Sequence, residues 1–310
     1  MIPEPSFDIL VAGEINPDLI LSGNAVPEFG QVEKLVEDAT LSIGSSSAIF
    51  ACGAARLGLK VAFIGVCGDD VFGRFMLDEM SKRNVDVSNV IIRSNGQTGL
   101  SVILNRDADR AILTHPGLIA ELQVSDISDA LLTQSRHLHV ASYFLQTKLQ
   151  PDLPKIFSRA HTHGLTTSLD TNWDPSNEWH GFDELLAQVD VFLPNENEAK
   201  AIARKDEVET ALVYLATKSK LVAIKRGADG ASAKTKDISI SAPSILVKVV
   251  DTVGAGDTFD AGFMFGYLNG WNLDKSLRLA VVCGALSTQS AGGTNGQPTL
   301  EEAMQYLKSK

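Results

Sequence analysis

Residues 251–257, with the sequence DTVGAGD, constrain this chain more than any other stretch. The run before them, 245–250 (ILVKVV), is rich in β-branched residues, which predicts a strand, and the run 258–268 has helical periodicity with one aromatic face. A glycine-rich turn that leads into a helix presents several backbone N–H groups to one point, where the helix dipole adds positive potential. This junction suits an anion, and the Asp257 carboxylate at its rim is placed to accept a proton from a hydroxyl. The spacing alone equally allows a tight turn whose aspartate caps the helix.

Composition limits the possible partners. The chain has 310 residues, of which 44% are hydrophobic and 21% charged, as in an ordinary globular protein. A formal net charge of -11 argues against nucleic acid or an anionic membrane as a partner, because both favour clustered Lys and Arg. No apolar run reaches the length of a membrane span, and the N-terminus lacks the pattern of a secretion signal. The expected location is therefore the cytoplasm.

Strand-like runs alternate with helix-like segments, which predicts an open, mostly parallel α/β sheet. Polar and glycine residues follow most of these strands, at the sheet edge where such folds bind ligands, so the pattern predicts a ligand cleft there. The predicted strands are 8–12, 61–66, 137–141, 166–169, 191–193, 221–224 and 245–250.

Two segments, about 16–42 and 97–115, contain strand-like pieces without helices between them. We expect them to form a small antiparallel β lid on a single domain that spans residues 1–310. The apolar face of such a sheet needs cover, which favours a homodimer formed through the lid. The pieces are 18–21, 31–35, 100–105 and 111–114, with a hairpin turn predicted at 107–110.

Common phosphate-binding and hydrolase motifs are missing from the sequence. It contains no G-x-x-x-x-G-K-[ST] phosphate loop, no G-x-G-x-x-G after the first strand and no G-x-S-x-G elbow. A Walker-type nucleotide hydrolase, a dinucleotide-binding enzyme and an α/β-hydrolase are therefore disfavoured.

Residues 251–257, continued by 261–264 (AGFM), resemble the C-terminal signature of the ribokinase-like, or PfkB-type, carbohydrate kinases. Four other segments resemble elements of that family in the family's order, so that the resemblance covers nearly the whole chain. The resemblance implies a ribokinase-like α/β fold, an open sheet flanked by helices, and transfer of phosphate from ATP to a carbohydrate. The four segments are 13–18 (GEINPD), 44–58 (GSSSAIFACGAARLG), 195–198 (NENE) and 225–230 (KRGADG).

The resemblance assigns catalytic roles to the junction. Asp257 would be the base that deprotonates the attacking hydroxyl. The backbone N–H groups of Gly254, Ala255, Gly256 and Asp257 would form an anion hole for the transferring phosphoryl group. Asp251 would help to hold a monovalent cation (K⁺) behind this hole, together with carbonyl groups near residues 287–293.

The resemblance also assigns a nucleotide side to the cleft. Asn195 and Glu198 would order Mg²⁺ around the phosphates of ATP, in keeping with the oxygen ligands that Mg²⁺ prefers. Without the family, the same pair indicates a helix-start cap. Gly227 and Gly230 would let the chain approach the nucleotide closely, and Lys225 would either reach a phosphate or be solvated.

On the substrate side, Asn16 and Asp18 are the sugar-binding candidates, because an amide and a carboxylate can grip neighbouring hydroxyls. The alternatives are a simple turn for Asn16 and an exposed lid position for Asp18. Gly44 and Ser45 should border the same pocket.

Two departures from the family pattern bear on the substrate. Asp170 and Asn172 resemble part of a D-x-N-x-R element of fructokinases and ketodeoxygluconate kinases, but Asp174 stands in place of the arginine, which disfavours an acidic sugar. Ile49 replaces a usual asparagine and makes the pocket more apolar. We expect a hydroxyl, by preference primary, of a neutral sugar or polyol as the acceptor. The alternatives are a nucleoside kinase and a non-catalytic sugar- or nucleotide-binding sensor.

Overall fold

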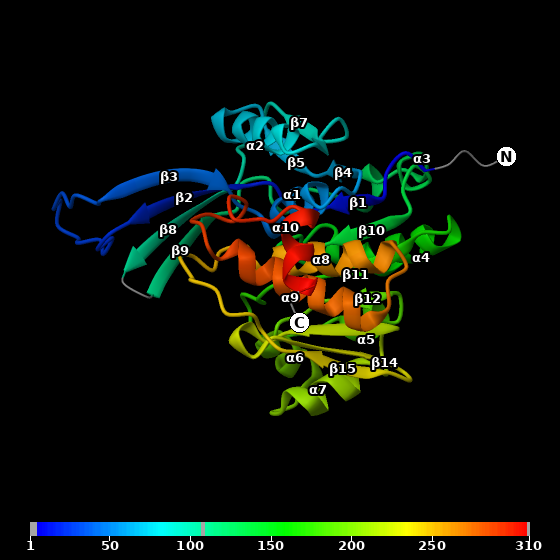
Figure 1. The fold of residues 1–310 in the computed structure, drawn as a ribbon. Helices are drawn as coiled ribbons and strands as arrows, with labels where there is room; N and C mark the ends of the chain where they lie inside the picture. Colours follow the sequence, from blue (N-terminus) through cyan, green and yellow to red (C-terminus); the bar gives the residue numbers. More distant parts are fainter. Residues whose placement is uncertain (1–4, 107–108, 309–310) are drawn as a thin grey trace.

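The computed structural model describes residues 5–106 and 109–308, and within these ranges a nine-stranded sheet forms the centre of the molecule (Figure 1). The pairs from β13 to β6 are parallel, and β14 and β15 add an antiparallel edge, so the predicted open, mostly parallel sheet is confirmed. In sheet order the strands are β15 (Ser239–Ala242), β14 (Ala231–Thr235), β13 (Leu221–Lys225), β12 (Val191–Phe192), β11 (Thr166–Leu169), β10 (His137–Val140), β1 (Ile9–Ala12), β4 (Val61–Ile64) and β6 (Val85–Asp86).

Helices cover both faces of this sheet, and each face has its own apolar core. Alternate residues of β1 show the division: Ile9 and Val11 belong to one core, whereas Leu10 and Ala12 belong to the other, as expected for a strand buried on both sides. The first core contains residues of α1 (Ser46–Arg56), α2 (Val71–Lys82), α8 (Ala255–Leu268), α9 (Leu273–Ser287) and α10 (Leu300–Lys308). The second contains residues of α3 (Asp129–Leu132), α4 (Leu153–Thr162), α5 (Phe182–Leu186), α6 (Glu196–Ala203) and α7 (Val208–Leu215).

A second, four-stranded sheet projects from one side of the main sheet (Figure 1) and corresponds to the predicted lid. Its strand order is β3 (Asp38–Ile43), β2 (Pro17–Ser22), β8 (Leu100–Arg106) and β9 (Asp109–His115). The two outer pairs are antiparallel as predicted, but the central pair β2–β8 is parallel, because both strands run outward from the main sheet. Residues 107 and 108 of the predicted hairpin turn lie outside the described residues. The strands on either side pair up to Arg106 and Asp109.

Two predicted strands are wrong. Residues 31–35 form an irregular, exposed segment, and the lid strand begins later, at Asp38. Residues 245–250 are also irregular: Ile245 and Val247 pack against the core, whereas Leu246 and Val250 are exposed. Both segments have strand-like composition but pair with no neighbouring strand. Strand-like composition is therefore not enough to place a segment in a sheet, because its backbone also needs a partner strand to bond with.

The remaining elements are short. They are the pair β5 (Val66–Gly68) and β7 (Ile91–Arg93), and the 3₁₀ turns η1 (Val124–Asp126), η2 (Gln150–Asp152) and η3 (Gly227–Asp229). Every helix within the described ranges is too short or too polar to cross a lipid bilayer.

Candidate active site

A cavity of about 270 Å³ lies where the lid meets the first turn of α8 and the carboxyl ends of β1, β10 and β11. It brings together Asn16, Asp18, Ser45, Asn172 and Asp257, which the sequence had predicted to share a site. The sequence reasoning had not singled out several other polar groups in its lining, which are Glu14, Ser46, Ser101, Arg110, Thr114 and Ser142. Apolar lining comes from Ile49, Ile103, Ile112, Ile119, Leu145 and Val253.

Asn16 and Asp18 form the wall of the cavity at the start of the lid. Both are buried, so the alternative of an exposed lid position for Asp18 is wrong. The Asn16 amide lies 3.4 Å from Ser101 Oγ on β8. Burial raises the pKa of Asp18 to about 7, against the opposing effect of the Arg110 guanidinium. At Gly44 a Cβ atom would lie only 2.2 Å from Asp18 Oδ1, so glycine at 44 is what makes room for this carboxylate.

The hydroxyl of Ser45 is occupied by structural contacts. It donates to the Glu14 carbonyl (2.7 Å) and accepts from Ala48 N–H (3.0 Å) as the N-cap of α1. The Glu14 carboxylate is buried and accepts from Ser47 N–H, Ser47 Oγ and Ser142 Oγ. A glutamate directly after a buried first strand was the sequence signal for this residue. Its three donors come from α1 and from the loop after β10, so only the folded chain reveals them.

The residues predicted to form an anion hole lie at the start of α8. Gly254 caps the helix with φ 71°, a left-handed conformation that favours glycine, and a Cβ there would meet the Gly293 carbonyl at 2.7 Å. The N–H groups of Gly254, Gly256 and Asp257 have no acceptor among the residues that the structure describes, whereas Ala255 N–H lies 3.3 Å from the Thr252 carbonyl. These amides are therefore available to an anion at the helix N-terminus.

Asp257 is buried at this helix end and borders the cavity. Burial raises its pKa from 3.8 to about 8, with a further rise from Asp170. The Lys225 ammonium and the Ser46 hydroxyl act in the opposite direction. A carboxyl group whose pKa lies near the working pH is suited to proton transfer.

Asp251 joins the loop before α8 to the loop after α9. Its carboxylate accepts from Val253 N–H (3.0 Å) and from Gly292 N–H (2.9 Å), and its own N–H donates to the Thr288 carbonyl (3.1 Å). The two segments that were predicted to share a monovalent cation thus lie side by side. Each carboxylate oxygen keeps a further lone pair, as a monovalent cation requires, although the Arg110 guanidinium lies 4.0 Å from Asp251 Oδ1.

On the nucleotide side, Asn195 and Glu198 form a capping box at the start of α6, which is the alternative that their spacing had left open. Glu198 Oε2 accepts from Asn195 N–H (2.8 Å), and Glu198 N–H donates to Asn195 Oδ1 (3.0 Å). Burial, reinforced by Asp170, raises the pKa of Glu198 to about 7. A buried carboxylate with spare lone pairs fits Mg²⁺ bound through water, with phosphates as the other ligands.

The two glycines of the nucleotide-side turn have different surroundings. A Cβ atom at Gly227 would meet open space, which leaves room for a ligand. At Gly230 it would lie 2.1 Å from the Ala242 carbonyl, so this glycine serves the contact with the end of β15. Only Gly227 therefore has the open approach expected for a nucleotide.

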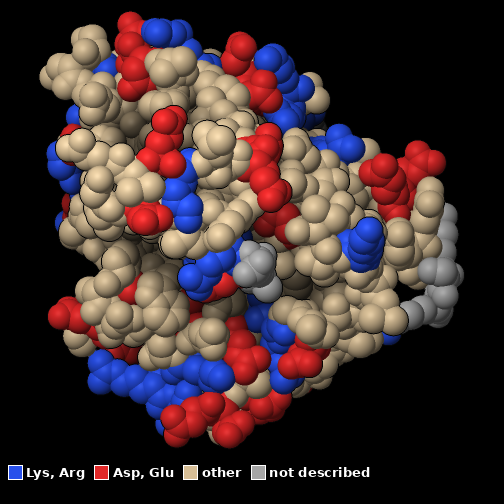
Figure 2. Space-filling view, turned by 90° about the vertical axis from the view of Figure 1, so that its left-hand side faces the viewer, with Lys and Arg blue, Asp and Glu red and all other residues tan. Residues whose placement is uncertain are grey.

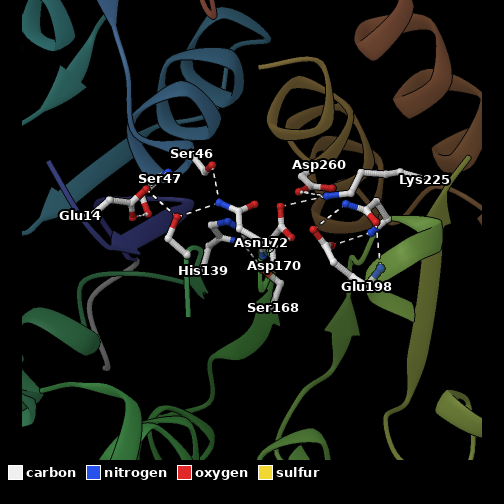
Figure 3. Close-up of polar contacts among 12 residues, drawn as sticks. Glu14, Ser46, Ser47, His139, Ser168, Asp170, Asn172, Glu198, Lys225 and Asp260 are labelled. Atoms are coloured by element: carbon white, nitrogen blue, oxygen red, sulfur yellow. Dashed lines mark hydrogen bonds and ion pairs between the residues drawn. The ribbon is translucent and has the colours of Figure 1, made fainter. Parts of the chain in front are cut away.

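Lys225 is not solvated, contrary to one of its two predicted alternatives. Its ammonium lies 2.9 Å from Asp170 Oδ2 and 2.9 Å from Asp260 Oδ2, in the buried layer below α8 (Figure 3). Asp170 also accepts from Asn172 N–H (3.3 Å), and Asn172 Nδ2 donates to Ser46 Oγ (2.5 Å) and to the hydroxyl of Ser142 (2.8 Å). Asp170 thus lies behind the cavity wall, whereas Asn172 is part of it.

Asp174 does not line the cavity. Its carboxylate accepts from Ser176 N–H and Oγ and from the N–H groups of Glu178 and Trp179, so it stabilises the loop in which it lies. The Asp174 side chain therefore does not face the cavity, and the expectation that an aspartate in place of the arginine disfavours an acidic sugar stays a prediction. Ile49, in contrast, does contribute an apolar wall as expected.

Comparison with known proteins gives matches over nearly the whole chain. The model of the family described as pfkB family carbohydrate kinase matches residues 6–300. An ATP-dependent ribose-1-phosphate kinase from Halopiger xanaduensis is 30% identical, over 97% of this chain and 98% of that protein. A 5-dehydro-2-deoxygluconokinase from Geobacillus thermodenitrificans is 29% identical, over 87% of this chain and 85% of that protein. In fold, the chain is similar to a protein from E. coli described as a ribokinase II and solved with ATP and Mg²⁺, with a TM-score of 0.85, 23% identity, and coverage of 98% of this chain and 100% of that one.

Proposed function

The chain belongs to the pfkB family of carbohydrate kinases, and we propose that it transfers the γ-phosphoryl group of ATP to a hydroxyl, by preference primary, of a neutral sugar or polyol. One observation carries this proposal. A buried carboxyl group, Asp257, faces a cavity from the first turn of a helix where the N–H groups of Gly254, Gly256 and Asp257 have no described acceptor. A base and an anion site are thus adjacent, as phosphoryl transfer to an alcohol requires.

In the proposed reaction, ionised Asp257 accepts the proton of the acceptor hydroxyl while that oxygen forms a bond to the γ-phosphorus. The bond between the γ-phosphorus and the bridging oxygen breaks, and ADP leaves. The N–H groups of Gly254, Gly256 and Asp257 donate to the transferring phosphoryl oxygens, where negative charge must be stabilised. Mg²⁺, near Glu198, would neutralise charge on the phosphates of ATP. K⁺ near Asp251 would stabilise the loop that carries the anion hole.

Asn16 and Asp18 would hold the hydroxyls of the acceptor, while Asn172, Gly44 and Ser45 shape the pocket around them. With its pKa near 7, Asp18 can accept or donate a hydrogen bond to a hydroxyl. A polyhydroxy compound satisfies both kinds of group, so a neutral sugar fits this wall.

The test is an ADP-release screen over sugars, polyols, nucleosides and sugar phosphates, with Mg²⁺, in the presence and absence of K⁺. We expect turnover with at least one neutral sugar or polyol, and its loss by orders of magnitude in Asp257→Asn with little change in ATP affinity. Wild-type-like activity of Asp257→Asn would refute the assignment of the base. ATP binding without turnover of any acceptor would favour a sensor.

A second candidate acceptor is a sugar phosphate. Arg110, on β9, is the one Lys or Arg in the described lining of the cavity, and a guanidinium is well suited to bind phosphate. The Halopiger xanaduensis relative is named for such an acceptor, ribose-1-phosphate. The neutral sugar ranks first because Glu14, Asp18 and Asp257 give the same cavity three carboxyl groups. Turnover restricted to phosphorylated acceptors would reverse this ranking.

We also propose that two copies associate through the lid in the cytoplasm. The lid and the segment that leads to β3 expose Phe29, Leu35, Ile112 and Leu113, and uncharged surface occupies much of the side from which the lid projects (Figure 2). Covering such side chains favours association. Sedimentation should give a dimer at micromolar concentration, and a monomer there would count against the lid interface.

A further inference from the structure

Lys225 forms a buried ionic cluster with Asp170 and Asp260 (Figure 3), and none of the three residues lines the cavity. The three residues come from the end of β13, the loop after β11 and the second turn of α8. The lysine side chain is 11% exposed, and the two aspartates are 2% and 1% exposed. Such a cluster is costly to desolvate, so it is weak evidence for stability and calls for a functional explanation.

The ammonium lies beside the helix turn that carries the predicted anion hole. A Cβ atom placed on Gly256 would be 3.7 Å from Lys225 Nζ, so the lysine contacts the first turn of α8. Asp260 is three residues after Asp257 and therefore lies on the same side of the helix, one turn further on. The contact between Lys225 and Asp260 thus holds the turns that carry the base and the free N–H groups.

On its other side the cluster supports the cavity wall. Asp170 accepts from Asn172 N–H (3.3 Å) and so helps to hold Asn172 at φ 53°, a left-handed conformation that is unusual for a non-glycine residue. From this position Asn172 donates to Ser46 Oγ, and the Ser46 hydroxyl lowers the pKa of Asp257. Through its contacts with Asp260 and Asp170, Lys225 therefore connects the helix that carries the base with the wall of the cavity.

The two carboxyl groups of the cluster differ in the direction in which their pKa values are shifted. Burial alone would raise the pKa of Asp170, but Lys225 and the hydrogen bonds around it hold that pKa below its ordinary value. Burial raises the pKa of Asp260 well above its ordinary value. Beside the lysine cation, Asp170 is thus the carboxyl group that favours the anion and Asp260 the one that favours the neutral form, and the ammonium lies next to Gly256. The charged groups that face Asp257 are Asp170, Lys225 and Glu14.

We propose that Lys225 is a positioning residue for phosphoryl transfer: anchored by Asp170 and Asp260, its ammonium holds the first turns of α8 in place and directs positive potential at the 254–257 amides without touching ATP. This role rests on the kinase reaction proposed above. It differs from the contact with a phosphate that the sequence suggested: two of the three N–H donors of the ammonium already have carboxylate acceptors, and the test below separates the two roles.

The test compares a neutral cluster with a charged one. In Lys225→Met/Asp170→Asn both charges are removed together, so that no unpaired ion remains buried and the fold should be as stable as the wild type or more stable. We expect kcat of this double variant to fall about 10- to 100-fold, because the preorganised potential at the anion hole is lost. The KM for ATP and the Kd of ATP by calorimetry should change less than about threefold, because Lys225 does not contact the nucleotide.

Two further variants complete the design. Asp260→Asn keeps the pair of charges and imitates the neutral Asp260, so its kcat should stay at least about tenfold above that of the double variant. Lys220→Met is the matched control: it takes an ammonium from another buried carboxylate, Asp190, away from the cavity, and should leave kcat unchanged. Thermal unfolding of every variant shows whether it is folded.

Each outcome decides the proposal. A folded double variant with wild-type kcat would show that the cluster is structural only, and a large rise in its Kd for ATP would show that Lys225 binds phosphate instead. Either result overturns the positioning role. If the wild type itself releases no ADP with any acceptor, the kinase reaction fails rather than this inference alone. The Kd of ATP and the unfolding temperatures are measured without an acceptor, so these two failures remain distinguishable.

Discussion

Replacing the base should stabilise the unliganded protein at alkaline pH. Asp257 is 8% exposed, and its pKa rises from 3.8 to about 8 on folding. A carboxyl group with a raised pKa contributes stability that is complete below the unfolded pKa and is lost as the pH rises through the folded one. The folded state must then hold an ionised carboxylate in a buried site. Asp257→Asn keeps the shape, loses the charge and should escape this loss.

The size of the effect follows from the shift in pKa. Each unit corresponds to about 1.4 kcal/mol, so a shift of about 4 units sets an upper limit of about 6 kcal/mol at pH 9. Relaxation around the carboxylate reduces this, and we expect Asp257→Asn to be more stable than the wild type by about 2–5 kcal/mol at pH 9. The difference should shrink steadily toward pH 5, where folded Asp257 is protonated.

The assay is urea unfolding of the ligand-free protein at pH 5, 7 and 9. Asp18 and Glu198, whose pKa values also rise to about 7, change the stability of both proteins alike and cancel in the difference. Asp274→Asn, at a half-exposed ion pair with Arg278, removes the same charge outside the site and is the matched control, measured at the same three pH values. Equal pH dependence in wild type and Asp257→Asn would refute the view that burial controls this carboxyl group.

Three further changes test other parts of the site. Gly254→Ala places a Cβ 2.7 Å from the Gly293 carbonyl at a residue with φ 71°, and it should lower kcat about 100-fold. Its control is Gly270→Ala, at φ 69° in open space, which should cost only about 1 kcal/mol of stability and leave kcat unchanged. Glu198→Gln keeps an acceptor for the helix cap but loses the charge, so the Mg²⁺ concentration for half-maximal rate should rise at fixed ATP. An unchanged Mg²⁺ titration would remove Glu198 from the metal site. Arg110→Met should raise the KM for any phosphorylated acceptor about tenfold or more and change the KM for a neutral acceptor much less, through its effect on Asp18, and equal effects on both would exclude phosphate recognition by Arg110.

Much of the frame could be predicted from local sequence. The strands of the main sheet are short apolar runs buried on both faces, and their order along the chain follows from alternation with helices. The glycine-rich start of α8 was recognisable because glycine at 254 and an aspartate in the first turn are local features. These predictions succeeded because each depends on residues that are neighbours in the sequence.

Other features depend on residues far apart in the chain. Residues 31–35 and 245–250 have strand composition but no pairing partner, and β2 pairs with β8 in parallel across 83 positions, from Asp18 to Ser101. Lys225 was predicted to be a phosphate ligand or a solvated lysine, and only folding placed two aspartates beside it, just as only folding showed that Asp174 bonds to its own loop. Local periodicity determined which segments of this chain form helices and strands, and at which edge of the sheet its polar residues gather. Only the tertiary structure decided which charges meet there, because burial and pairing between distant segments decide the partner and the protonation state of each group.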